Sequence, residues 1–146
     1  ITFGAGFLSF RDFSRRQSLA GGVKTLIGDI RLAQEQALSG KKPADDIDSG
    51  PTPKCDSTKA LITYDFKIIS NTNYVVEAAC TGGNVRIKSV ILSSDLTLTS
   101  TLPTVSFKPI GQGTLIPQGG AAILTITQAG TNATATVTVS SGGEIK

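Results

Sequence analysis

The sequence predicts an α+β fold, in which a long N-terminal helix packs on a head built as an antiparallel β-sandwich. No proline occurs between Phe7 and Leu38, and apolar residues recur there every three or four positions. After residue 60, short runs alternate between apolar and polar residues and are separated by glycine-containing turns. A chain of 146 residues fits one such domain, with the helix at residues 1–40 and the head at residues 41–146.

The helix is predicted from a stripe of apolar residues that share one side when wound at 3.6 residues per turn. Gly40, with Pro43 shortly after it, predicts where the helix ends. Polar residues such as Asp29 and Arg31 are expected mostly on the other faces. We expect the stripe to pack on the head, and its members are Leu19, Val23, Leu26, Ile30, Ala33 and Ala37.

Three glycines interrupt this helix. A helix over residues 7–38 would be about 48 Å long, more than a small domain is wide, so its N-terminal part is expected to project as an arm. Gly21 and Gly22 fall near the expected junction of arm and head, and each costs about 1 kcal/mol of helix stability relative to alanine. We therefore predict a hinge at this pair, and close packing on the sheet at Gly28.

Seven or eight short strands are expected in the head, after a loop rich in proline and glycine. Glycine turns between short alternating strands favour antiparallel sheets over parallel βαβ units. The strands are predicted at residues 60–69, 73–80, 84–92, 96–99, 104–107, 121–127, 133–139 and 144–146. Alternation predicts two inner faces, one with Ile62, Tyr64, Phe66 and Ile68, the other with Val85, Ile87 and Ile91.

The two cysteines, Cys55 and Cys80, lie 25 positions apart. In a chain rich in threonine and serine and low in charge, such a pair favours an exported protein with a disulfide. A loop of that size would stabilise the fold by about 3 kcal/mol if the bond acts through the entropy of the unfolded chain. Two cysteines without any histidine make a poor zinc site.

Catalytic patterns are weak throughout. The chain lacks histidine, the commonest general base at neutral pH. Ser39 and Lys42 match a serine–lysine spacing without its companion motifs, and Asp46 and Asp48 match the start of a calcium loop that lacks its closing glutamate. Asp65 and Glu77 are expected as solvent-facing strand residues. The sequence therefore predicts no enzyme, no catalytic residue, no metal site and no cofactor.

The first ten residues form an apolar run that ends at Arg11. A membrane-spanning helix needs about 20 such residues, so we interpret this run as the cut end of a longer hydrophobic helix. Its aromatic residues recur every three or four positions, on an arm too far out for the head to cover. We expect this stripe to contact partner helices, and its members are Phe3, Phe7, Phe10 and Phe13.

The layout resembles that of type IV pilins and type II secretion pseudopilins, in which a long N-terminal helix precedes a β-rich head. The helix end resembles that of the GspH/FimT-like minor pseudopilins through Leu32, Ala33, Glu35, Ala37 and Pro43. Two later segments resemble the "V-x-F-x-P-x-G" strand and turn of that family and its closing strand. The matching residues are Val105, Phe107, Pro109 and Gly111, then Val137, Val139 and Gly143.

The resemblance implies a structural subunit of a type IV pilus or type II secretion pseudopilus that assembles through its N-terminal helix. It implies other subunits as partners, the inner membrane and periplasm before assembly, and a periplasmic or cell-surface filament afterwards. An alternative is a DNA-binding minor pilin of natural transformation, with Arg86, Lys88 and Lys146 as candidates. The basic "G-R-x-R" of DNA-binding members corresponds here to Gly143–Lys146, where Glu144 departs from it. An adhesin-like sandwich unrelated to pilins is a third reading.

Overall fold

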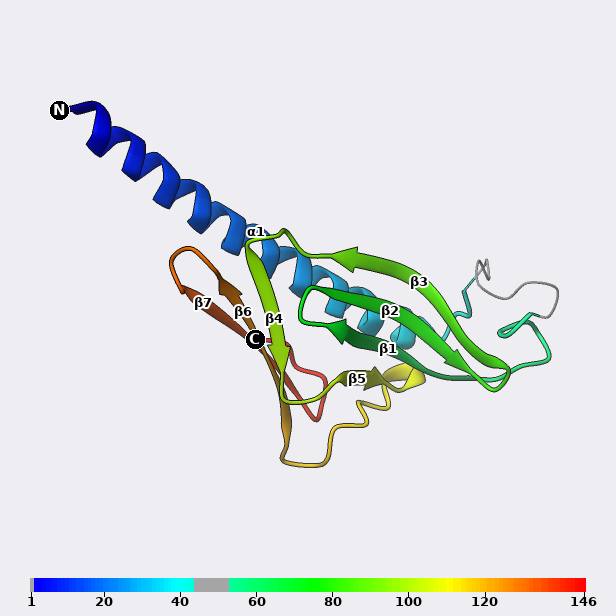
Figure 1. Cartoon of the computed structure of the whole chain (residues 1–146). Helices are drawn as coiled ribbons and strands as arrows, with labels where there is room; N and C mark the ends of the chain where they lie inside the picture. Colours follow the sequence, from blue (N-terminus) through cyan, green and yellow to red (C-terminus); the bar gives the residue numbers. More distant parts are fainter. Residues whose placement is uncertain (1, 44–52) are drawn as a thin grey trace.

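A computed structural model describes residues 2–43 and 53–146, with only the backbone described for residues 2–13. One helix and two antiparallel sheets make up the described chain (Figure 1). The helix is α1 (Thr2–Ser39). The remaining elements are β1 (Leu61–Ser70), β2 (Asn73–Cys80), β3 (Gly83–Ile91), β4 (Leu96–Ser100), β5 (Thr104–Phe107), the 3-10 turn η1 (Pro109–Gly111), β6 (Ala121–Gln128) and β7 (Thr134–Ser140). This is the predicted α+β architecture.

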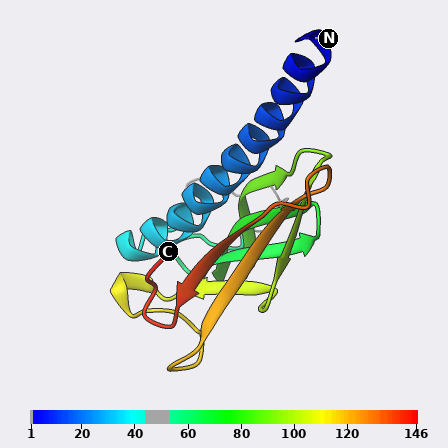
Figure 2. The same cartoon turned by 90° about the vertical axis from the view of Figure 1, so that its left-hand side faces the viewer.

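The first sheet has the strand order β3-β2-β1-β5, and the second has the order β4-β6-β7. The helix lies across both, and its N-terminal turns project away from the head (Figures 1 and 2). Gly40 ends the helix with φ of 66°, and its N–H donates to the carbonyl of Ala37 at 3.0 Å. Because that backbone conformation suits glycine, the predicted stop at this residue is confirmed.

The core is a single cluster shared by the helix and both sheets. Phe66 of β1 and Tyr74 of β2 lie with ring centroids 4.7 Å apart at its centre. Apolar side chains of β4, β6 and β7 close it from the other sheet, among them Leu98, Leu124 and Val137. The four aromatic residues of the head therefore all belong to the first sheet, and aliphatic residues supply the second.

The predicted inner faces of the first sheet are confirmed at Tyr64, Phe66 and Val85, which are buried, and Ile68 and Ile87 pack against the core. Two irregularities make the prediction wrong at Ile62 and Ile91. The pairing of β1 with β2 shifts between Leu61 and Thr63, and Ile62 is 52% exposed instead of facing inward. The pairing of β2 with β3 also shifts by one residue. Val76 pairs with Lys88 and the next residue, Glu77, pairs with Arg86, so Ile87 has no partner on β2 and forms a bulge. An extra residue reverses every later side chain, so Ile91 is 79% exposed.

The predicted disulfide between Cys55 and Cys80 is confirmed, with the two Cα atoms 5.4 Å apart. It ties the segment before β1 to the end of β2. Next to it, the Thr81 N–H donates to the carbonyl of Ala60 at 2.9 Å. A Cβ at Gly82 would meet the carbonyl oxygen of Lys54 at 2.5 Å, so this turn needs glycine for the segment to cross it.

The surroundings of the three helix glycines differ from those predicted. The helix runs through Gly21 and Gly22 without a break, and head contacts lie further toward the N-terminus, where the Arg15 side chain approaches Gly130 and Ser18 donates to Asp95. The pair thus lies inside the head-packed part and not at the junction of arm and head, and local melting of the helix at this pair stays a prediction. Gly28 is exposed with nothing within 4 Å of an added Cβ, whereas a Cβ at Gly22 would meet Leu96 Cδ1 at 2.7 Å. Close packing therefore belongs to Gly22.

Substituting alanine at the two neighbouring glycines separates these roles. Gly21→Ala meets no atom within 4 Å, so we expect it to raise the free energy of unfolding by about 1 kcal/mol through helix propensity alone. Gly22→Ala gains the same propensity but must displace the buried Leu96 side chain. Denaturant unfolding should give Gly22→Ala a clearly lower free energy of unfolding than Gly21→Ala. Equal free energies would contradict the packing role of Gly22.

Candidate functional site

The helix face predicted to meet the head divides into two parts. Leu26, Ile30, Ala33 and Ala37 are buried in the core, whereas Leu19 and Val23 are only partly buried at its margin. The small alanines near the C-terminal end of α1 let the sheets approach it closely. The apolar row is therefore fully covered from Leu26 to Ala37 and only partly covered at Leu19 and Val23.

A buried carboxylate fixes α1 on the first sheet. Asp29 is 3% exposed, and it accepts hydrogen bonds from the Tyr74 hydroxyl at 2.6 Å and from Lys88 Nζ at 2.5 Å. Burial, together with the bond to Asp29, raises the pKa of the Tyr74 hydroxyl far above its usual value. The sequence pattern had placed Asp29 on a solvent face, so its role as a link between helix and sheet was missed.

The irregularity in β3 explains how a lysine reaches this carboxylate. Val85 faces the core, and regular alternation would point Lys88 outward. The extra residue at Ile87 reverses the strand, so Lys88 shares its face with its cross-strand partner Val76, a core residue. A β-bulge that redirects one side chain is thus what pairs Lys88 with Asp29.

A second carboxylate holds the N-terminal part of the covered helix. Asp95, just before β4, accepts hydrogen bonds from the Ser18 hydroxyl of α1 at 3.2 Å and from Gln128 Nε2 at 3.0 Å. Near the other end of α1, Gln34 Nε2 donates to the carbonyl of Gly143 at 2.6 Å. Polar contacts to the head therefore run from Ser18 to Gln34.

The contact at Asp95 predicts a loss of stability in acid. The hydrogen bond from Gln128, with a smaller contribution from Ser18, lowers the pKa of Asp95 against the opposing effect of burial. A lowered folded-state pKa stabilises the fold above the unfolded pKa of about 3.9, and this contribution is lost as the pH falls through the folded value. Asp95→Asn should therefore unfold more easily at pH 7, and the difference from wild type should shrink toward pH 3. A constant difference across that range would contradict this.

The candidate DNA-binding residues do not form one basic surface. Lys88 is paired with the buried Asp29, and Lys146 Nζ lies 3.8 Å from Glu144 Oε1. Arg86 is exposed on β3, an edge strand of the first sheet, whereas Lys146 pairs with Thr138 of β7 in the other sheet. Two of the three charges are thus paired with carboxylates, Lys88 with one on α1 and Lys146 with one in the head.

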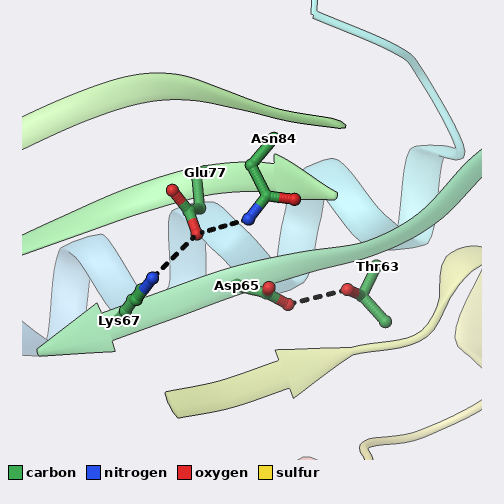
Figure 3. A network of polar contacts seen from close by, with 5 residues as sticks. All are labelled: Thr63, Asp65, Lys67, Glu77 and Asn84. Atoms are coloured by element: carbon green, nitrogen blue, oxygen red, sulfur yellow. Dashed lines mark hydrogen bonds and ion pairs between the residues drawn. The ribbon is translucent and has the colours of Figure 1, made fainter. Parts of the chain in front are cut away.

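The carboxylates of β1 and β2 lie opposite each other, since Asp65 pairs in register with Glu77 (Figure 3). Glu77 was predicted to face solvent, but it is only 8% exposed. The Asn84 side chain donates to it at 3.1 Å, and Lys67 Nζ lies 3.9 Å from its carboxylate. Asp65 accepts from the Thr63 hydroxyl at 2.7 Å. Each carboxylate therefore has its own donor in the sheet.

Residues that could form a metal site do not cluster within the described ranges. Asp46 and Asp48, the start of the weak calcium-loop pattern, lie outside the described residues. The side chains of Phe3, Phe7, Phe10 and Phe13 also lie outside them; the backbone that carries these residues is helical and projects from the head (Figure 2). Among the described residues, no helix has a stretch apolar enough to cross a membrane.

The chain is similar in structure to the minor pseudopilin EpsH from the type 2 secretion system of Vibrio cholerae. The TM-score is 0.57 at 14% sequence identity, over 88% of this chain and 94% of that one. No family model and no curated protein matches the sequence. At this identity the similarity establishes a pseudopilin-like fold, in agreement with the expectation from the sequence.

Proposed function

We propose that this protein is a non-enzymatic structural subunit of a pilus-like or pseudopilus-like filament, and that it assembles through the N-terminal turns of α1. The observation that carries the proposal is the division of this helix. From Ser18 to Ala37 it is held by two carboxylate contacts and a buried apolar row, while its first turns project beyond the head (Figure 1).

The sequence of the projecting turns supports a helical partner. Four phenylalanines recur there every three or four positions. In a helix they fall on one side, and an aromatic stripe without a covering domain is typical of an interaction surface. The pseudopilin-like fold supports other subunits of the same assembly as the partners, and an envelope location before and after assembly.

Paired serine substitutions on the arm test this proposal. Phe7 lies on the aromatic stripe, whereas Leu8 lies about 140° from Phe3 around the helix. We expect the chain to self-associate in sedimentation velocity at about 100 μM, Phe7→Ser to weaken that association at least tenfold, and Leu8→Ser to change it little.

Circular dichroism of both variants should match wild type, because the helical backbone at both positions lies in the turns that project from the head (Figure 2). A chain that remains monomeric at that concentration, or equal effects of the two substitutions, would contradict assembly through this stripe.

A further inference from the structure

A groove runs along the side of α1 that faces β7. Its volume is about 610 Å³. The half-covered apolar row of α1 forms its floor, and β7 contributes the small side chain of Ala135. The lining residues from α1 are Arg16, Leu19, Ala20, Val23, Lys24, Ile27 and Arg31.

Every charged residue in this lining is basic. Arg16, Lys24 and Arg31 fall within about 80° of one another around the helix, beside the apolar residues Val23 and Ile27. Within the described part of the chain, none of these three basic side chains is in an ion pair. The groove therefore offers an apolar row and an uncompensated positive row to the same ligand.

The edge of β7 beside the groove is partly occupied by the C-terminal tail. β7 is an edge strand, and Thr138 exchanges two backbone hydrogen bonds with Lys146, at 3.1 and 2.9 Å. Ser140 N–H donates to the Glu144 carbonyl at 2.9 Å. Residues 144–146 thus lie antiparallel to the end of β7, between this strand and α1 (Figure 2).

Among the described residues, none pairs with the same edge further toward the start of β7. Strand alternation points the N–H and C=O of Thr136 to the same side as those of Thr138. No described residue is hydrogen-bonded to Thr136 on that side. The groove at Ala135 is therefore the continuation of the path that the tail follows from Glu144 to Lys146.

We propose that this groove binds an extended segment of a partner protein that carries both acidic and apolar side chains, added as a strand to the open edge of β7. Backbone hydrogen bonds to Thr136 would give the segment its direction. Its apolar side chains would cover Val23 and Ile27, and its carboxylates would meet Arg16, Lys24 and Arg31. The inference rests on β7 and the stretch of α1 from Arg16 to Arg31, independently of the phenylalanine stripe on the projecting arm.

Two other ligands fit these features less well. A lipid surface would leave the N–H and C=O groups of Thr136 without hydrogen-bond partners, which is costly in an apolar medium. A DNA backbone would leave the apolar row uncovered, because phosphates pair only with the three basic side chains. An extended peptide satisfies the strand edge, the apolar row and the charges together.

Fluorescently labelled peptides test the proposal by anisotropy with residues 1–146. The probe Thr-Val-Thr-Glu-Thr-Val-Thr-Glu places valine and glutamate on one side of a strand. We expect micromolar binding that weakens at least tenfold between 0.1 and 0.5 M salt, and at least tenfold weaker binding of the same peptide with lysine for glutamate. N-methylation of alternate peptide amides should abolish binding, because it removes the strand pairing.

Protein variants locate the site. The combined substitution Arg16→Glu, Lys24→Glu and Arg31→Glu should invert the preference, so that the lysine peptide binds more tightly than the glutamate peptide. Arg86→Glu, on the other sheet, is the matched control and should change neither affinity. Circular dichroism confirms that each variant is folded.

Three results would overturn the proposal. One is absence of binding up to 1 mM peptide, and another is equal affinity for the two peptides. In the third, the peptide does not bind, but phosphatidylglycerol vesicles or a 20-base-pair DNA duplex bind in a way that depends on the same three basic residues. That result would assign the groove to the lipid or to DNA.

Discussion

Lys88→Met is expected to lower the free energy of unfolding by about 3–5 kcal/mol at pH 7. The Asp29 side chain is 4% exposed, so removing its cation leaves a buried carboxylate with the Tyr74 hydroxyl as its only described donor. Asp29→Asn should cost less, about 1.5–3 kcal/mol, because the remaining lysine is 44% exposed and can be hydrated.

Because Asp29 is buried and Lys88 is partly exposed, removing either partner should have a different effect on stability. The double variant Asp29→Asn with Lys88→Met should be more stable than Lys88→Met alone, since the buried charge is gone. Lys67→Met is the matched control, because Lys67 is also 44% exposed but lies 3.9 Å from Glu77, which keeps Asn84 as a donor. We expect a cost of about 0–1 kcal/mol there. Urea denaturation of the four variants measures the differences, and equal costs for Lys88→Met and Lys67→Met would contradict the role given to Asp29.

Much of the fold follows from the sequence because its signals are local. The end of α1 depends on Gly40, whose backbone conformation is a property of that residue. The predicted strand boundaries depend on turns with glycine or asparagine, and these fall close to the observed ends of β2 and β3. The pseudopilin-like fold was foreseen from short motifs in the right order along the chain.

The features that were missed depend on contacts between distant segments. The alternation of Val85, Ile87 and Ile91 carries no sign of the extra residue at Ile87, because a bulge is set by the neighbouring strand. Without it, Lys88 appears exposed, and nothing indicates that Asp29 has a partner. Gly22 and Gly28 look alike in the helix, and only the position of Leu96 distinguishes them.

The groove beside β7 was missed for the same reason. Leu19 and Val23 continue the apolar spacing of Leu26 and Ile30, so periodicity assigns all of them to the core. The structure covers the second pair fully and the first pair only in part. How much of the helix the head covers depends on where the strands of the head end. The spacing of apolar residues in the helix does not indicate this.

The disulfide carries the second large expected effect. Replacing Cys55 and Cys80 together by serine should lower the free energy of unfolding by about 3 kcal/mol, because the bond closes a loop across a separation of 25 residues. Both cysteines are buried, at 6% and 4% exposure, so two buried hydroxyls add to that cost.

The contacts around the bond define where the effect should appear. The hydrogen bonds of the segment before β1 include that from Thr81 N–H to the Ala60 carbonyl at 2.9 Å and that from Ala60 N–H to the Thr81 hydroxyl at 3.0 Å. Lys42 Nζ also donates to the Asp56 carbonyl at 2.9 Å. These contacts flank exposed chain, so we expect reduction to free residues 53–60 before the sheets unfold. Limited proteolysis with and without dithiothreitol should give new cleavage near Lys54 or Lys59 only in the reduced protein.

Gly82→Ala tests the close approach of this segment to the turn after β2. The added Cβ would meet the Lys54 carbonyl, so this variant should show the same cleavage with the cysteines intact. An unchanged cleavage pattern after reduction, together with an unchanged unfolding midpoint, would show that the packing of this segment, and not its covalent link, holds it on the sheet.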